Sequence, residues 1–252
     1  MITNNTDGFP VHTPNNPNKF EFDVEVARIF DNMAERSIPM YREARSITTK
    51  LAVERIHRKW GENEVATVVD VGASTGAFFR DLWFALGYEL NQEIPDFNAI
   101  AIDSSKPMLD RLSMYHPKVV CLQIDALEIR QHVFDAEVVN LAYVVQFLRR
   151  KKRPIFFNDI YSIMNKGGLL ICSQKDRVDT HFSDEFADQY MQFRKDNRYT
   201  EKEIADKTKA LSGSMWPQSY DATLNQIVDA GFQDPQEVCR WLQFSTLVAN
   251  KR

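Results

Sequence analysis

Residues 66–76 read ATVVDVGASTG, a short apolar run that ends in a glycine-containing loop. The β-branched residues before Gly72 predict a buried strand, and the residues after Gly76 predict a helix. Gly72 and Gly76 permit a tight turn that lets a ligand lie against the backbone, beside the free N–H groups of the helix start. A pyrophosphate cofactor would usually require a further glycine at Ala77. The loop therefore indicates either a binding loop for another nucleotide-type ligand or a plain strand–helix turn.

Strands and helices alternate along the rest of the chain. This alternation predicts an α/β fold, a doubly wound, Rossmann-like parallel sheet with helices on both faces. Two closing strand-like runs, separated by almost nothing, predict an antiparallel hairpin at one sheet edge, which fits methyltransferase-type sheets better than dehydrogenases. The predicted strands cover residues 66–71, 98–102, 118–124, 136–142, 169–173, 237–242 and 244–249, and the predicted helices cover residues 77–86, 106–115, 154–164 and 220–230.

The chain divides into an arm and one domain. Residues 1–19 are rich in Asn and Pro, and we expect a flexible arm there. Residues 20–252 form the domain, which begins with a helical leader over residues 20–60 that Pro39 interrupts. Residues 176–215 are polar, helical in pattern and rich in aromatic residues, and we expect them to form an inserted lid.

The charges are nearly balanced, with 31 basic and 35 acidic side chains and a net charge of −4. This balance gives no general support for nucleic-acid binding, although a local patch could still bind a phosphate backbone. One dense basic run occurs, Arg149-Arg150-Lys151-Lys152-Arg153. It is either such a patch or a solvated loop at the start of a helix.

The three cysteines, Cys121, Cys172 and Cys239, are widely spaced and form no Cys/His cluster, so we expect neither a disulfide framework nor a metal site. No apolar run approaches the ~20 residues of a membrane span, and residues 1–18 lack the regions of a signal peptide. We therefore expect a soluble, cytoplasmic protein without a membrane partner.

Acidic residues close three successive predicted strands. Asp70, Asp103 and Asp125 each stand where a strand ends, at the edge where doubly wound sheets bind their ligands. A carboxylate at Asp103 can accept both hydroxyls of a ribose, and Asp125 could accept a hydrogen bond from an adenine amino group. Each could also be a simple turn or cap residue, but together they favour an adenosine-containing ligand.

Eight segments then carry a more specific resemblance. The sequence resembles the carboxy-S-adenosylmethionine synthase family, a branch of the class I methyltransferase fold. The resemblance runs from about Phe20 to the C-terminus, and its leader and tail segments are not generic to methyltransferases. The matching segments are residues 22–33, 36–41, 70–76, 100–105, 146–148, 199–204, 230–232 and 243–249.

The resemblance implies S-adenosylmethionine as the cofactor. It implies that Tyr41 contacts the methionine end and that the remaining cofactor contacts come from Asp70, Gly72, Ala73, Ser74, Gly76, Asp103, Ser104, Asp125, Ala126 and Ala142. Members of the family convert S-adenosylmethionine and prephenate into a carboxylated sulfonium for the modification of wobble uridine in tRNA, and they tend to form homodimers.

Two positions depart from the family's pattern. The arginine that contacts the new carboxylate falls on Thr208, which Lys209 follows, and an asparagine of the fourth strand falls on Ala142, two residues after Asn140. Threonine cannot replace the bidentate fork of a guanidinium, and lysine does so only as a point charge. We therefore expect an intact cofactor site with changed second-substrate chemistry.

Methyl transfer to a small or unidentified acceptor is the least demanding such chemistry, because a sulfonium methyl is already activated. We expect Tyr41, Arg198 and Tyr199 to be the catalytic residues, with Tyr143 and His181 as further candidates on the acceptor side. Two alternatives stay open. One is a carboxy-S-adenosylmethionine synthase that binds its carboxylate through Lys209 or Arg198, and the other is a non-catalytic S-adenosylmethionine-binding protein.

Overall fold

A seven-stranded mixed sheet forms the centre of the molecule, with the strand order β5-β4-β3-β6-β7-β9-β8. The computed structural model describes residues 2–4, 10–12, 20–87 and 95–252. The parallel strands are β3 (Ala66–Val71), β4 (Phe97–Ile102), β5 (Val120–Leu122), β6 (Ala136–Ala142) and β7 (Met164–Lys175). Strands β8 (Gln233–Trp241) and β9 (Phe244–Asn250) form an antiparallel hairpin on β7. The doubly wound α/β fold with its antiparallel edge is thus confirmed.

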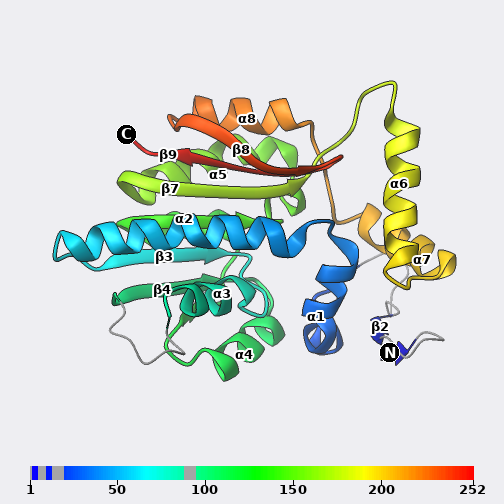
Figure 1. Ribbon diagram of the computed structural model, residues 1–252, viewed down its shortest axis with the longest axis horizontal. Coiled ribbons are helices and arrows are strands. Elements are labelled where there is room, and N and C mark those ends of the chain that lie inside the picture. The colour runs from blue at the N-terminus through cyan, green and yellow to red at the C-terminus, as the bar shows by residue number, and fades with distance from the viewer. Residues whose placement is uncertain (1, 5–9, 13–19, 88–94) are drawn as a thin grey trace.

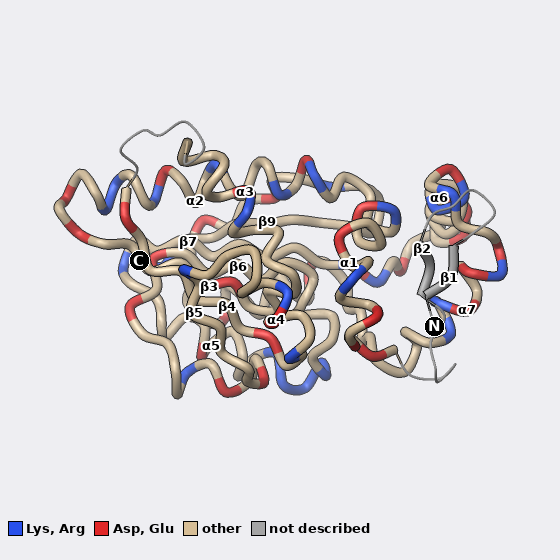
Figure 2. The backbone as a smooth tube through the Cα atoms, turned by 90° about the horizontal axis from the view of Figure 1, so that it is seen from below, with Lys and Arg blue, Asp and Glu red and all other residues tan. Residues whose placement is uncertain are grey.

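Helices cover both faces of this sheet (Figures 1 and 2). One face carries α2 (Tyr41–Gly61), α3 (Ala77–Ala85) and α4 (Lys106–Tyr115), whose apolar side chains pack in one core cluster with those of the sheet. The other face carries α5 (Arg153–Ile163) and α8 (Tyr220–Asp229) in a second cluster. Because both faces are buried, the central strands are mostly apolar, as the sequence indicates.

Three strands differ from their predicted ranges by more than one residue; of these, β7 begins at Met164 instead of residue 169, and β8 begins at Gln233 instead of residue 237. The predicted strand over residues 118–124 is only Val120–Leu122, because it lies at the sheet edge and pairs with β4 alone. The strand predicted over residues 169–173 extends to Lys175, because Gln174 and Lys175 continue the ladder against Ser245 and Phe244. This extension brings Lys175 to the carboxyl edge of the sheet.

The leader and the insert lie at that same edge (Figure 1). The leader consists of α1 (Val24–Ser37) and α2, and the chain turns between them at Met40 with a φ of +54°. Residues 176–215, the lid insert, contain α6 (Ser183–Asp196) and α7 (Glu201–Ser212). A capping box of Thr200 and Glu203 starts α7.

Short 3₁₀ turns connect several of these elements. They are η2 (Ala126–Gln131), η3 (Val145–Phe147) and η4 (Arg150–Lys152). The predicted flexible arm covers residues 1–19, most of which lie outside the described residues; those described pair as a short hairpin of β1 (Ile2–Asn4) and β2 (Pro10–His12). Within the described ranges, no helix has the length and apolar character needed to cross a membrane.

Candidate cofactor and substrate site

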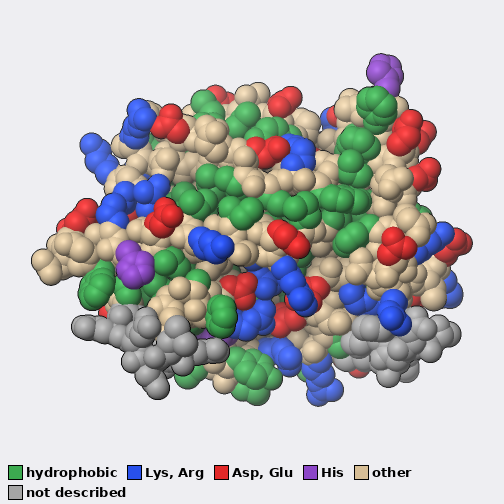
Figure 3. All heavy atoms as spheres, in the orientation of Figure 1, with side chains coloured by type: hydrophobic (Ala, Val, Ile, Leu, Met, Phe, Trp, Pro, Cys, Tyr) green, Lys and Arg blue, Asp and Glu red, His purple; other side chains and the backbone are tan. Residues whose placement is uncertain are grey.

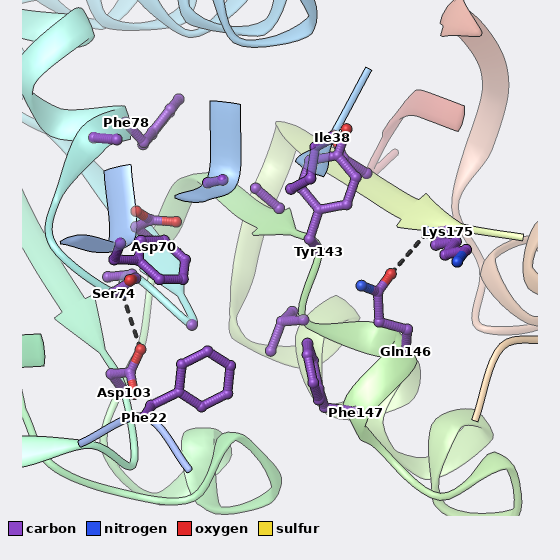
Figure 4. A pocket seen from close by; sticks show the side chains of 18 of the residues that line it. Phe22, Ile38, Asp70, Ser74, Phe78, Asp103, Tyr143, Gln146, Phe147 and Lys175 are labelled. Atoms are coloured by element: carbon purple, nitrogen blue, oxygen red, sulfur yellow. Dashed lines mark hydrogen bonds between the residues drawn. The ribbon is translucent and has the colours of Figure 1, made fainter. Parts of the chain in front are cut away.

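A cavity of 380 Å³ opens at the carboxyl edge of the parallel strands. Its wall comes from the leader helices, the segments after β3, β4, β5 and β6, the end of β7, and the lid insert. Figure 4 shows two groups of polar side chains in it: Asp70, Ser74 and Asp103 lie on one side, and Gln146 and Lys175 lie on the other. The ring of Tyr143 stands between them.

The loop after β3 forms the floor of the first side. Gly72 has a φ of +68°, and a Cβ atom there would lie 2.9 Å from Val144 Cγ2, so only glycine fits without displacement. Gly72 N and Ala73 N donate hydrogen bonds to Ile102 O at 2.7 and 3.0 Å, which ties the loop to β4. The loop thus approaches the cavity as bare backbone, as a ligand-binding turn requires.

Asp103 is held by this loop and by its own. Its Oδ2 accepts a hydrogen bond from Ser74 N at 2.9 Å, and its Oδ1 accepts one from Ser105 N at 2.8 Å. Burial raises the pKa of Asp103 and these backbone donors oppose the shift. Each carboxylate oxygen keeps a further lone pair that can accept a ligand hydroxyl. The donor set therefore fits a ribose, which offers two neighbouring hydroxyl groups.

Asp70 lies deeper in the same wall. It is 3% exposed and accepts a hydrogen bond from Asn140 Nδ2 at 2.8 Å. Burial raises the pKa of Asp70 to about 7, and the Asn140 hydrogen bond opposes this shift. Asn140 and Ala142 are two residues apart on β6 and both line the cavity, because alternate residues of a strand share a face.

Two tyrosines form the middle of the cavity. The Tyr41 and Tyr143 ring centroids are 6.0 Å apart, and the Arg45 guanidinium lies 4.6 Å from the Tyr41 ring centroid. Burial raises the pKa of Tyr41 and that of Tyr143, so both phenols stay protonated at neutral pH. Tyr143 also has a φ of +60°, an uncommon backbone conformation for an aromatic residue and one often kept at functional sites.

Aromatic rings and Asp125 line another part of the wall. Phe22 of the leader packs edge-on against Phe147, with ring centroids 5.6 Å apart. Asp125 and Ala126 line the cavity at the start of η2, where Asp125 Oδ1 accepts a hydrogen bond from Leu127 N at 2.9 Å. This part combines flat apolar surface with an exposed carboxylate, and an adenine ring requires both.

Lysines line the side opposite Asp103. Lys207 Nζ donates a hydrogen bond to Ser37 Oγ at 2.8 Å, and Lys175 Nζ lies 4.6 Å from the Tyr190 ring centroid. Burial lowers the pKa of Lys207 to about 7 and that of Lys175 to about 8, with a contribution from neighbouring Arg194 in each case. No carboxylate among the described residues counters either shift.

Most of the sequence-predicted residues come together in this cavity. Its lining includes Tyr41, Asp70, Gly72, Ala73, Ser74, Asp103, Ser104, Asp125, Ala126 and Ala142, together with Tyr143. Gly76 lies outside the lining, where a Cβ atom would lie 2.8 Å from Leu112 Cγ of α4.

The other predicted catalytic residues also lie outside the lining. Tyr199 is buried behind Ser37, with 3.2 Å between the two hydroxyl oxygens, and Arg198 is exposed. Lys209 is exposed as well, and Thr208 donates a hydrogen bond to Ile204 O within α7. The structure therefore places the proposed Lys209 away from the cavity, and it is Lys207 of the same helix that lines it.

Sequence reasoning missed Lys175 and Lys207 as site residues. A signal for Lys175 exists, because it ends a parallel strand at the same edge as the three acidic residues. Lys207 has no comparable local signal, since only the packing of α7 on α1 brings it to Ser37, 170 residues away in the sequence.

The fold and the glycine loop define the class of protein. The sequence pattern of the methyltransferase domain matches residues 69–172. A solved structure of an O-methyltransferase family protein from Burkholderia thailandensis superposes with a TM-score of 0.61 at 15% identity, over 91% of this chain and 60% of that one. The class is thus the Rossmann-like S-adenosylmethionine methyltransferases, and S-adenosylmethionine is the cofactor.

The curated relatives are closer and span nearly the whole chain. The carboxy-S-adenosyl-L-methionine synthase of Campylobacter hominis is 31% identical over 92% of this chain and 95% of its own length. That of Helicobacter hepaticus is 30% identical with the same coverage. This chain belongs to the carboxy-S-adenosyl-L-methionine synthase family, and it is an S-adenosylmethionine-dependent transferase.

Proposed function

We propose that this protein transfers a carboxyl group to S-adenosylmethionine from a second substrate that carries a carboxylate. The reaction is then carboxy-S-adenosylmethionine synthesis. The observation that carries the proposal is the pair of cavity lysines, Lys175 and Lys207, which have no acidic partner among the described residues. The lysine pair therefore favours the carboxy-S-adenosylmethionine synthase among the activities left open by the sequence, with Lys207 in place of Lys209 or Arg198 as the group that binds the carboxylate.

The argument for an anion is energetic. Removing an ammonium group from water is costly unless an opposite charge or hydrogen bonds replace the lost hydration. Lys207 has one hydrogen bond, to Ser37 Oγ, and Lys175 packs against the Tyr190 and Phe244 rings. Arg194 adds a third cation, whose Nε is buried without a hydrogen-bond partner. A carboxylate in the cavity would offset the costs of Lys175 and Lys207, which line it, whereas Arg194 lies behind the lining and donates from Nη1 to Thr208 Oγ1.

The cofactor half of the proposal uses the opposite side of the cavity. Asp103 accepts from the ribose hydroxyls, Asp125 and Ala126 border the adenine, and the loop over residues 72–74 lies along the cofactor backbone. Tyr41, as a protonated phenol beside Arg45, donates a hydrogen bond toward the methionine end. This arrangement directs the sulfonium toward the middle of the cavity, between Asp103 and the lysines.

Ordinary methyl transfer is the second candidate. The observation in its favour is Thr208, which stands at the position of the family's carboxylate-binding arginine and bonds within its own helix. A methyl acceptor needs no carboxylate, and positioning alone supplies most of the catalysis when the methyl group is already activated. The two candidates differ in whether product formation requires a carboxylate donor.

The test compares products with and without prephenate. The purified protein is incubated with S-adenosylmethionine, and the carboxylated sulfonium is measured by mass spectrometry alongside an authentic synthase. We expect prephenate-dependent product. We also expect Lys175→Met and Lys207→Met to lower kcat/KM by at least about tenfold, the effect of losing roughly 1.4 kcal/mol of binding, while S-adenosylmethionine binding is kept.

Lys209→Met is the matched control, because Lys209 is an exposed lysine on the same helix as Lys207. It should behave as the unaltered protein does. Absence of product, with the authentic synthase active, would reject carboxy-S-adenosylmethionine synthesis. S-adenosylhomocysteine formation with an acceptor panel would then identify a methyltransferase, and binding without turnover would identify a non-catalytic binding protein.

A further inference from the structure

The dense basic run over residues 149–153 has no place in the proposed reaction. As sequence, it is either a phosphate-binding patch or a solvated loop. It lies at the start of α5, after η3, and its members differ sharply in exposure: Arg153 is 1% exposed, whereas the four residues before it are exposed. On the face of the molecule viewed in Figure 3, acidic and basic side chains are interspersed.

Arg153 is engaged entirely within the protein. Its Nε and Nη2 donate hydrogen bonds to Leu148 O at 3.1 and 3.0 Å, and Nη2 also donates to Trp216 O. Burial lowers the pKa of Arg153 to about 10. A guanidinium buried this deeply donates its hydrogen bonds to backbone carbonyls and is not accessible to an external phosphate.

The two exposed arginines reach the same segment. Arg150 donates a hydrogen bond to Pro217 O, and the Arg149 guanidinium lies 5.2 Å from the Trp216 ring centroid. In the described part of the chain, neither Lys151 nor Lys152 makes a hydrogen bond, ion pair or ring contact with that segment through its side chain. The run therefore separates into three arginines that hold residues 216–217 and two lysines that do not.

Residues 213–219 connect α7 to α8, and one of them forms part of the site. Met215 lines the cavity, and Trp216 N donates to Gln146 O at 2.8 Å. Arg177 N donates to Gln218 O at 2.8 Å, so the two ends of the insert are held together at its base. Because α7, which carries Lys207, ends at Ser212, contacts that hold residues 216–217 in place also restrain the end of this helix.

We infer that Arg149, Arg150 and Arg153 are positioning residues that fasten the C-terminal end of the lid insert to the sheet, and that the basic run is not a phosphate contact. The planar guanidinium is suited to this task, because it stacks flat on an indole and its fixed fork of donors reaches carbonyl oxygens, whereas an ammonium contacts a ring or a carbonyl only as a point charge. These contacts keep Met215 and Lys207 in position at the cavity.

The test uses a charge-conserving pair of substitutions. R149K/R150K keeps every positive charge but loses the stacking and the reach to Pro217 O, and both sites are exposed, so the fold is kept. K151A/K152A removes two charges and leaves the fastening intact. We measure hydrogen exchange of the lid insert and of strands β3 and β6, and the binding of a duplex oligonucleotide and of tRNA.

We expect R149K/R150K to raise the exchange rate of α7 amides by about five- to tenfold, with strand exchange unchanged, because the insert opens locally. KM for the second substrate should rise about threefold while kcat changes little. K151A/K152A should match the unaltered protein in both respects. Unchanged α7 exchange in R149K/R150K would overturn the inference. Nucleic-acid binding that K151A/K152A abolishes and R149K/R150K retains would also overturn it, in favour of a phosphate contact.

Discussion

Ser74 N donates a hydrogen bond of 2.9 Å to Asp103 Oδ2, which joins the loops after two neighbouring strands. The φ of +51° at Ser74 points this N–H toward the next strand and away from its own helix. The glycine loop and the ribose acceptor are therefore one unit. A change at Asp103 should alter the loop as well as the hydroxyl contacts.

We expect Asp103→Asn to weaken S-adenosylmethionine binding by about 10- to 100-fold, or roughly 1.4–3 kcal/mol. The amide NH₂ would replace one acceptor oxygen and would face the backbone N–H of Ser74 or of Ser105, so that two donors oppose each other. Isothermal titration calorimetry measures the loss. Asp110→Asn is the control, because Asp110 is an exposed carboxylate that pairs with Lys106 on α4. Equal affinities of the two variants would contradict the role of Asp103.

Asp70 should make the protein less stable as the pH rises. Burial raises its pKa from 3.8 to about 7, so between those values the folded state binds more protons than the unfolded state. Stability therefore falls from about pH 4 to about pH 7, by up to about 4 kcal/mol for this group alone. Asp70→Asn removes the titration and keeps an acceptor for Asn140. We expect urea unfolding to show that the variant exceeds the unaltered protein in free energy of unfolding by more at pH 8 than at pH 5. A difference between the two proteins that does not depend on pH would reject this prediction.

The local hydrophobic pattern of the sequence predicts the boundaries of the central strands well and those of the edge strand poorly. The predicted strands over residues 66–71 and 136–142 have the same bounds as β3 and β6, because their apolar runs are buried on both faces and end at clear turns. At the sheet edge the predicted range was too long, since Val120 is 56% exposed and pairing on one side supports only a short strand. Strand length there depends on tertiary pairing, which local pattern does not encode.

The two sides of the cavity differ in the same way. The side with Asp70, Asp103 and Asp125 follows from strand ends, a rule that needs only the order of strands. The lysine side depends on how the lid insert packs back on α1, which joins Lys207 to Ser37 across 170 residues. No periodicity within α7 distinguishes Lys207 from Lys209, and only the packed helix shows which of them faces the cavity.

The lysine pair predicts proton uptake when an anionic second substrate binds. In the free protein the pKa of Lys207 is about 7 and that of Lys175 about 8, so both are partly neutral at pH 8. A bound carboxylate favours the charged forms and raises both pKa values. We expect the affinity for prephenate to fall as the pH rises from 7 to 9. Calorimetry at pH 8 in buffers of different ionisation enthalpy should show net uptake that Lys207→Met reduces, and uptake unchanged in that variant would refute the assignment.

Substitution of three glycines by alanine compares positions where a Cβ atom is hindered with one where it is not. A Cβ at Gly72 would lie 2.9 Å from Val144 Cγ2, one at Gly76 would lie 2.8 Å from Leu112 Cγ, and both positions have a positive φ. Gly61 ends α2 with nothing within 4 Å of its would-be Cβ. We expect Gly72→Ala and Gly76→Ala each to lower stability by about 1–3 kcal/mol, and Gly61→Ala to raise it by about 0.5–1 kcal/mol. Because Gly72 lines the cavity and Gly76 does not, only Gly72→Ala should also weaken S-adenosylmethionine binding when both variants are measured under conditions where they are fully folded. Equal loss of binding in the two would contradict the assignment of Gly72, and not Gly76, to the cofactor site.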